Sequence, residues 1–503
     1  MTITLIERVE EQAGRVAIVD TAGEYTYDDL LVASETVART LLAGRTDLGE
    51  ARVAFMVAPG FDYVAVILGI WRAGGIAVPL SPTHPAPELE YVLDDTGAEA
   101  VVADKANEMR VKPLATARDA WFVRSADAIE GTGADSILHS LPAALGVGEA
   151  RRAMILYTSG TTNRPKGVVT THGNLRAQIE SLVEAWAWSA DDHILHVLPL
   201  HHTHGIVNAL LCPLWAGATC EMLPGFDARR VWDRFVDGGP TVFMAVPTIY
   251  AKLIAEWERA TPQERERMSD GARTLRLMVS GSAALPVTVF ERWHEITGHA
   301  LLERYGMTEI GMALSNPLEG ERRAGTVGQP LPGVAVQLRD ENGAVLADDG
   351  PGEIHVRGPG VFLEYWNRPE ATRTAFRDDW FCSGDVAVVE EGYYRILGRS
   401  SVDIIKTGGY KVSALEIEEA LREHPSVKDC AVVGVEDPEW GERVCTVVVP
   451  ASTTSAQSAD SLKNWLAERI APYKLPRRWM FVDELPRNSM GKVTKVAVKE
   501  MFE

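Results

Sequence analysis

The chain of 503 residues is long enough for roughly two to four domains and for a large core that needs no disulfide bonds. Apolar residues make up 46% and charged residues 24%, a composition that excludes disordered, collagen-like and coiled-coil proteins. The net charge of −20 argues against general nucleic-acid binding, and five cysteines without a C-x-x-C pair exclude a disulfide framework and a cysteine-rich zinc site.

The N-terminal residues contain neither a basic stretch nor an apolar stretch, so no signal peptide is expected. The most apolar long segment, 205–220, contains Asn208 and Pro213 and is short for a membrane helix, which favours a buried core segment. We expect a cytoplasmic protein without a membrane span, present as a monomer or weak dimer.

Short apolar runs alternate with helical patterns along the first four hundred residues. Val53–Val57 reads as a strand, Tyr63–Ala73 as a helix and Ile76–Leu80 as the next strand, a βαβ unit that implies a parallel sheet with flanking helices. Further strands are expected at 241–246, 275–279 and 300–302. Residues 126–149 have weak periodicity and look like a connection. The pattern predicts an α/β fold whose large N-terminal domain, residues 1–399, contains parallel or mixed sheets flanked by helices.

The last hundred residues follow a different pattern. Ser413 to Glu416 is a capping box that opens a helix ending near Pro425. Strands are expected at 430–435, 444–449 and 479–482, and a helix at 462–470. This unit, residues 400–503, is predicted to be a small mobile α+β domain. Its basic end suggests that it brings positive charge to an anionic ligand.

The segment 156–167 places hydroxyls, glycines and a lysine between two strands. It reads Leu-Tyr-Thr-Ser-Gly-Thr-Thr-Asn-Arg-Pro-Lys-Gly. Glycines let successive N–H groups point into one concavity, hydroxyls add donors and Lys166 adds a charge, a combination that suits phosphate oxygens. A Walker A loop would continue from Gly-Lys into a helix, whereas here Lys166-Gly167 continues into a strand. A polar hairpin turn is the alternative interpretation.

This segment resembles the signature loop of the adenylate-forming superfamily, which includes acyl-CoA synthetases, peptide-synthetase adenylation domains and luciferase-like enzymes. Asn163 replaces the usual glycine, and asparagine tolerates a positive φ better than most residues. Further motifs similar to those of the family follow in the expected order, at 24–30, 198–205, 279–286, 303–309, 380–385, 398–399 and 486–492. The resemblance implies two steps: a carboxylate attacks the α-phosphate of ATP, and a thiol then attacks the acyl-adenylate.

The resemblance also assigns an ATP site. The implied ATP-binding residues are Thr158, Ser159, Gly160, Thr161, Thr162, Lys166, Glu303, Arg304, Tyr305, Gly306, Met307, Thr308, Asp385 and Arg399. Tyr305 would stack on adenine, and Asp385 would accept hydrogen bonds from both ribose hydroxyls. Glu309 and Thr158 would hold Mg²⁺, because hard oxygen ligands suit this ion.

Four residues are implied in catalysis: Lys492, His202, Glu309 and Thr158. Lys492 would place its ammonium between the carboxylate and the α-phosphate, as a cation and not as a base. His202 would line or gate the acid pocket. Both steps bring negative charges together, so positioning and charge neutralisation are expected to dominate catalysis.

The second substrate is implied to be coenzyme A. Gly408, Gly409 and Tyr410 would border its pantetheine arm, because glycine allows a narrow chain to pass close to the backbone. The family rotates its small domain about a hinge between the two steps. Asp403 is the predicted hinge residue, in a connection, 399–403, that is one residue longer than the common pattern.

Residues 303–317 and 401–412 look closest to malonyl-CoA synthetases. A dicarboxylic acid needs a cation for its second carboxylate, because burying that charge unpaired costs several kcal/mol. The acid-binding candidates are Arg276, Arg322, Lys252, Ser280 and His202. Replacement of Arg322 by alanine is predicted to raise the KM for malonate far more than that for acetate.

The predicted reaction is therefore the ATP-dependent ligation of malonate to coenzyme A. The sequence leaves open methylmalonate, a short monocarboxylic acid as substrate, or a carrier protein in place of coenzyme A. A catalytically inactive scaffold is disfavoured by the presence of Lys166, Glu309, Asp385 and Lys492.

Overall fold

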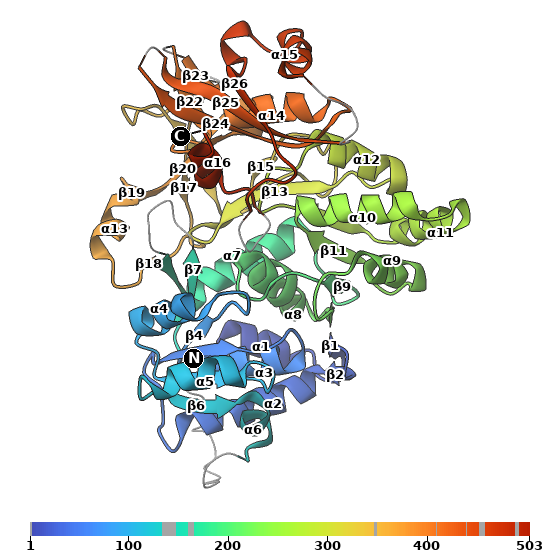
Figure 1. Ribbon diagram of the computed structural model, residues 1–503. Helices are drawn as coiled ribbons and strands as arrows, with labels where there is room; N and C mark the ends of the chain where they lie inside the picture. The colour runs from blue at the N-terminus through green and yellow to red at the C-terminus, as the bar shows by residue number, and fades with distance from the viewer. Residues whose placement is uncertain are drawn as a thin grey trace.

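A computed structural model describes residues 3–132, 147–158, 165–346, 350–408, 410–438, 440–451, 458–487 and 492–502. Figure 1 shows layers of sheet and helix in the first four hundred residues and a C-terminal lobe at one end of the molecule. The described ranges contain four sheets. The predicted fold class, a large α/β part followed by a small α+β part, is confirmed.

A seven-stranded sheet has the strand order β18-β8-β7-β4-β3-β5-β6. Its centre is the predicted βαβ unit, with β3 at Arg52–Met56, α3 at Phe61–Arg72 and β4 at Ile76–Pro79, the two strands being parallel. α3 is buried on nearly every side because its sequence is apolar around the whole helix. The other elements of this part are β5 (Ala100–Ala103), β6 (Trp121–Arg124), β7 (Arg152–Thr158), β8 (Lys166–Thr171), β18 (Glu364–Tyr365), α1 (Thr4–Glu10), α2 (Tyr27–Leu42), α4 (Ala86–Thr96), α5 (Glu108–Thr116) and α6 (Ser125–Glu130).

A nine-stranded sheet has the order β15-β14-β13-β12-β11-β9-β10-β1-β2 and is parallel from β13 to β1. Its parallel strands end at one edge, where functional side chains of open α/β sheets gather. The strands are β1 (Val16–Val19), β2 (Glu24–Thr26), β9 (His193–His196), β10 (Thr219–Met222), β11 (Val242–Ala245), β12 (Leu277–Ser280), β13 (Leu302–Met307), β14 (Gly311–Ser315) and β15 (Gln329–Pro330). The helices are α7 (His172–Ala185), the π-helix η1 (His204–Leu211), α8 (Cys212–Ala216), α9 (Ala228–Asp237), α10 (Pro247–Arg259), α11 (Pro262–Arg273) and α12 (Val287–Thr297).

A third, antiparallel sheet follows in the chain. It contains β16 (Ala335–Arg339), β17 (Gly352–Arg357), β19 (Phe376–Arg377), β20 (Trp380–Glu390) and β21 (Tyr393–Arg399), with α13 (Pro369–Thr374) beside it. The register between β17 and β20 shifts, because Glu353 lies opposite Val386 whereas His355 lies opposite Cys382. The residues 383–385 on β20 therefore bulge out of the ladder.

The C-terminal lobe has its own sheet and an apolar core on each face of it. The strands are β22 (Ile404–Thr407), β23 (Tyr410–Ser413), β24 (Val427–Asp437), β25 (Gly441–Pro450) and β26 (Arg478–Phe481); the helices are α14 (Ala414–Arg422), α15 (Ala459–Ala467), the 3-10 turn η2 (Pro472–Lys474) and α16 (Lys495–Glu500). Ser413 caps α14 as predicted, since its hydroxyl accepts from the Glu416 N–H at 3.2 Å. The Glu416 carboxylate binds Lys474 at 2.7 Å instead of completing the box.

Two predicted segments differ from the structure. Residues 125–130, at the start of the expected connection, form α6, and 133–146 lie outside the described residues. The strand expected at 300–302 begins at Leu302 and continues to Met307. The apolar segment 205–220 is buried in η1, α8 and β10 as predicted, and no helix in the described ranges is long and apolar enough to span a bilayer.

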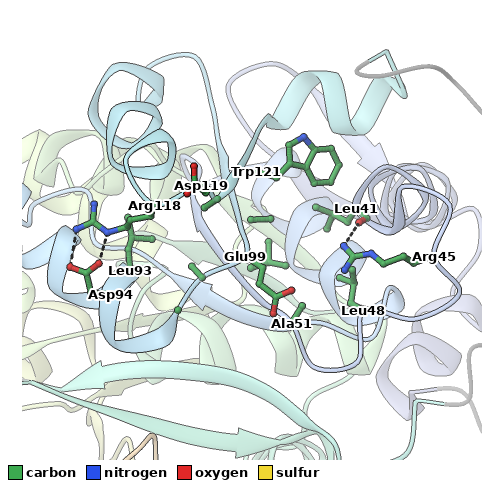
Figure 2. Close-up of a pocket in the computed structure, with 15 residues that line it drawn as sticks. Leu41, Arg45, Leu48, Ala51, Leu93, Asp94, Glu99, Arg118, Asp119 and Trp121 are labelled. Carbon is green, nitrogen blue, oxygen red and sulfur yellow. Dashed lines mark hydrogen bonds and ion pairs between the residues drawn. The ribbon is translucent and has the colours of Figure 1, made fainter.

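A hollow of about 680 Å³ opens at the amino ends of β3, β5 and β6 (Figure 2). Leu41, Leu48 and Trp121 form apolar walls, and Arg118 pairs with Asp94 at its rim at 2.6 Å. The ends of β7 and β8 that carry the phosphate loop lie at the opposite edge of this sheet. This hollow is therefore separate from the site described next.

Candidate active site

The predicted phosphate loop connects β7 to β8. Thr158 and Lys166 lie opposite each other in the last antiparallel pair before the loop. The Nζ atom of Lys166 lies 4.9 Å from the centre of the Tyr365 ring. The predicted ATP contacts Ser159, Gly160, Thr161 and Thr162 lie outside the described residues. The described ends of the loop bring one hydroxyl and one ammonium to the same edge.

Glu309 follows β13 and contacts the same tyrosine. Its Oε1 atom accepts a hydrogen bond of 2.9 Å from the Tyr365 hydroxyl, and the residue is 7% exposed. Burial raises the pKa of Glu309, while the Tyr365 hydrogen bond and the charges of Arg399 and Lys166 oppose that shift. A buried carboxylate whose ionisation is disfavoured is stabilised by an added cation, so this position fits a hard ion such as Mg²⁺.

Asp385 lies on the bulge of β20 and joins three strands. Its Oδ2 atom accepts from the Tyr305 hydroxyl at 2.7 Å, and its Oδ1 atom accepts from Nε of Arg399 at 2.9 Å. β13 can approach β14 closely at Gly306, because a Cβ there would lie 2.1 Å from the Gly311 carbonyl oxygen. The structure thus brings together an aromatic ring, a carboxylate and a guanidinium that are up to 94 positions apart in the sequence (305 to 399).

Lys492 reaches this region from the C-terminal lobe. Burial lowers the pKa of Lys492, the charges of Arg304 and Arg399 lower it further, and Asp385 opposes them. Burial, then the Lys492 charge, lowers the pKa of His202 to about 4. The ammonium therefore lies near the ends of both β13 and β21, next to a neutral histidine.

Arg304 is a buried cation with few partners. It is 2% exposed, its one printed hydrogen bond is a long contact of 3.4 Å to the Ser282 hydroxyl, and Nε has no partner among the described residues. Burial lowers the pKa of Arg304 to about 9 against the charge of Glu303. The Nδ1 atom of His204 lies 3.2 Å from the same Ser282 hydroxyl. The group remains charged at neutral pH and would be stabilised by an anion.

Glu303 contacts a different part of the fold. Its Oε1 atom accepts from the Leu285 N–H at 2.9 Å, and Oε2 has no partner in the described ranges. Burial raises the pKa of Glu303 to about 8, and the nearby Glu419 adds to this shift. Successive residues of a strand point to opposite faces, so Glu303 and Arg304 diverge although they are adjacent in the sequence.

The other predicted residues at this edge are Ser280, Met307 and Thr308. Ser280 ends β12 with a buried hydroxyl that has no partner among the described residues. Met307 ends β13, and Thr308 follows it; both are partly buried between Tyr305 and Glu309. Ser280 is thus a second unsatisfied polar group, beside Arg304, in this part of the site.

The three cations predicted for the second carboxylate are engaged elsewhere, which corrects that prediction. Arg276 donates to both oxygens of Asp192, at 2.6 and 2.7 Å, before the start of β12 and away from its functional end. Arg322 donates to the carbonyl oxygens of Ala300, Leu318 and Pro317. Lys252 is exposed on α10 with its Nζ 5.8 Å from the Phe226 ring centre.

The predicted coenzyme A residues lie at the β22–β23 turn. Gly408 has φ +56°, and its added Cβ would lie 3.2 Å from the Trp440 ring. Tyr410 is 54% exposed and stacks on Tyr473 with 4.3 Å between ring centres. Gly409 lies outside the described residues. The turn is thus a narrow, aromatic edge.

Asp403 lies between β21 and β22, where the chain enters the lobe. Its carboxylate accepts from the Arg399 N–H at 3.1 Å and lies 3.4 Å from Nζ of Lys495. Across the two parts, the Val287 N–H donates to Glu419 at 2.8 Å. These few polar contacts fix the lobe in an orientation that places Lys492 at the site.

Comparison with known proteins agrees with this geometry. Residues 5–366 match the family model described as AMP-binding enzyme, and residues 416–492 match that of the AMP-binding enzyme C-terminal domain. The chain belongs to the AMP-binding enzyme family. Among curated proteins it is similar to the human mitochondrial malonate–CoA ligase ACSF3, with 47% identity over 97% of this chain and 90% of that protein. The malonate–CoA ligase of Arabidopsis thaliana is 40% identical over 97% of this chain and 86% of that protein.

Solved structures of the family are also similar. ATP-bound MatB from Rhodopseudomonas palustris is 35% identical, with a TM-score of 0.89 over 100% of this chain and 99% of that one. The apo form of the same protein has a TM-score of 0.81. The predicted membership of the adenylate-forming superfamily is confirmed. The family uses ATP to activate acids for ligation, so this AMP-binding enzyme is an acid–thiol ligase that forms AMP.

Proposed function

We propose that the protein is a malonate–CoA ligase, which converts malonate, ATP and coenzyme A to malonyl-CoA, AMP and pyrophosphate through a malonyl-adenylate. The observation that carries the proposal is the buried guanidinium of Arg304, which has a free Nε within the described structure and lies near Lys492. A monocarboxylic acid would leave this charge unpaired, whereas the second carboxylate of malonate neutralises it. The malonate–CoA ligases named above support the same substrate.

In this proposal ATP lies across the edge formed by β7, β8 and β13. The ends of the phosphate loop, Thr158 and Lys166, face the phosphates, and Asp385 accepts from the ribose hydroxyls. Arg399, which already holds Asp385 at 2.9 Å, keeps that carboxylate ionised and oriented. Tyr305 borders the adenine.

Glu309 and Thr158 are the proposed ligands of Mg²⁺. The ion would neutralise phosphate charge, which removes repulsion between the nucleotide and the attacking carboxylate. The Tyr365 hydroxyl fixes one oxygen of Glu309 at 2.9 Å and thereby orients the carboxylate. The raised pKa of Glu309 means that a cation is needed for its full ionisation.

Lys492 is the proposed catalytic cation of the first step. One carboxylate of malonate attacks the α-phosphate, the bond to pyrophosphate breaks, and negative charge accumulates between the two anions. Lys492 lies close enough to Arg304, Arg399 and Asp385 to perturb their electrostatics and is itself perturbed by them. Its ammonium therefore bridges the acid side and the nucleotide side of the site.

The proposed acid pocket contains Arg304, Ser282, Ser280, His202 and His204. Arg304 binds the distal carboxylate, with the Ser282 hydroxyl between it and His204. Burial and neighbouring cations keep the pKa of His202 and His204 low, so both rings are neutral donors or acceptors and not competing charges. The pocket thus offers one cation to the distal end of the acid and Lys492 to its reacting end.

Thioester formation is proposed to need a second orientation of the small domain, residues 400–503. Rotation about Asp403 would withdraw Lys492 and bring the turn of Gly408 and Tyr410 to the adenylate. The thiolate of coenzyme A then attacks the acyl carbon, and AMP leaves. Cytoplasmic location and a monomer or weak dimer remain predictions from the sequence.

The decisive experiment is ATP–pyrophosphate exchange with malonate, methylmalonate, succinate, acetate and propionate, followed by detection of the thioester with free coenzyme A. Exchange that is strongest with malonate and gives malonyl-CoA is the expected result. Strongest exchange with acetate or propionate would identify a monocarboxylate ligase. Exchange without any thioester from free coenzyme A would point to a carrier protein as acceptor.

A further inference from the structure

Three side chains of the antiparallel sheet form a chain outside the acid and phosphate positions: Cys382 on β20, and His355 and Glu353 on β17. The sulfur of Cys382 lies 3.7 Å from Nδ1 of His355, its direct cross-strand partner. On the other side of the ring, Nε2 of His355 lies 3.7 Å from Oε2 of Glu353. His355 itself is 2% exposed.

The order of these groups matches a thiol, a base and a carboxylate. A metal ion would require the sulfur and the carboxylate to converge on one ring nitrogen, whereas here they face different nitrogens. Burial would lower the pKa of His355, but the hydrogen bonds and charges of Cys382 and Glu353 raise it to about 9. An imidazolium next to a cysteine sulfur is the setting in which thiols become nucleophilic.

Cys382 differs from the other cysteines of the chain in being accessible. All five cysteines lie in the described ranges; Cys382 is partly exposed, and the buried ones are Cys212, Cys220, Cys430 and Cys445. A reagent in solution therefore reaches one sulfur in the folded protein. That sulfur is the one with the histidine partner.

The chain of groups continues to the nucleotide site. The Oε1 atom of Glu353 accepts from the Gly384 N–H at 3.0 Å, and Gly384 precedes Asp385 on the bulge. The Ser383 hydroxyl donates to the Ile354 carbonyl at 2.7 Å, which fixes the same bulge to β17. A change in the charge of His355 thus reaches the backbone that holds Asp385 through one carboxylate.

We propose that Cys382 is a histidine-activated thiol that forms mixed disulfides with small-molecule disulfides, and that this modification weakens ATP binding through Glu353 and the Gly384 backbone. The second half rests on the proposed role of Asp385 at the ribose. The Cys382 thiolate attacks one sulfur of the reagent, a new S–S bond forms as the old one breaks, and the other half leaves as a thiolate. His355 loses its anionic neighbour, and its pairing with Glu353 changes.

The test uses the full chain and 5,5′-dithiobis(2-nitrobenzoate) as the disulfide. One thiol per chain is expected to react in a fast phase, and peptide mass spectrometry should locate the adduct on Cys382. Cys382→Ser should lose this phase and keep full activity. His355→Gln should slow it about tenfold or more. Glu353→Gln, which keeps an acceptor for Gly384, should also slow it and serves if the histidine variant does not fold.

The modified wild-type enzyme should show an ATP KM raised about tenfold, restored by dithiothreitol, while Cys382→Ser treated in the same way is unchanged. A thiol that reacts as slowly in the wild type as in His355→Gln overturns the proposal, as does a modified enzyme with an unchanged ATP KM. A fast phase that appears only after EDTA would show metal ligation and also overturn it. Thiol counts and rates need no substrate, so absence of malonate activation would refute the proposed function and leave this result standing.

Discussion

Arg304 offers the sharpest test of the acid preference. The perturbation is Arg304→Met, which removes the charge and keeps an apolar chain of similar length. Two unit charges about 4 Å apart at an effective dielectric constant of about 20 interact by roughly 4 kcal/mol, which corresponds to a factor of about 10³ in kcat/KM. We expect a loss of about 10²- to 10³-fold with malonate and little loss with acetate.

The assay is pyrophosphate release measured with both acids, together with the KM for ATP and thermal unfolding. The variant should not be less stable, because the pKa of Arg304 is lowered to about 9 and the charge is buried without a close partner. Lys252→Met is the matched control, since that lysine is exposed on α10. Equal losses with malonate and acetate, or a loss confined to the KM for ATP, would refute the assignment of Arg304 to the distal carboxylate.

Three further predictions separate the steps and the pH dependence. Lys492→Ala should lower ATP–pyrophosphate exchange by about 10² or more while thioester formation from supplied malonyl-adenylate is retained; a parallel loss of both would contradict a role in the first step alone. Gly408→Val should slow thioester formation and spare exchange, because φ is +56° and its Cβ would lie 3.2 Å from Trp440; equal effects on both steps would argue against a coenzyme A edge. The pKa of Glu303 is raised to about 8, above its usual value, so its contribution to stability is full below about pH 4.5 and is lost as pH rises through 8. Glu303→Gln should thus gain stability over wild type by a few kcal/mol in urea unfolding at pH 9 and not at pH 5, and a gain independent of pH would contradict the shift.

The sequence predicted the parts of the site that are written as local patterns. The hydroxyl-rich loop, the βαβ unit and the Ser413 cap depend on neighbouring residues, and the described structure contains all three where they were expected. Whether each motif residue plays its implied role remains a prediction for experiment.

Which cation faces the acid depends on contacts that no pattern in the sequence contains. Arg276, Arg322 and Arg304 all lie near motif residues in the chain, but Arg276 finds Asp192 and Arg322 finds three carbonyl oxygens. Arg304 alone of these three is buried at the functional end of its strand with a free Nε among the described atoms. An arginine is available to a ligand only where folding leaves its donors unpaired, and that is decided by residues distant in the chain.

The sequence by itself therefore determined the family, the two-part α/β fold and the position of the phosphate loop, because turns, caps and strand periodicity act over a few residues. Only the tertiary structure decided that Arg304 faces Ser282, that Lys492 enters from the C-terminal lobe and that Cys382 meets His355. The physical reason is that charge pairing and burial depend on distances in space, which strand order, register and the bulge on β20 set.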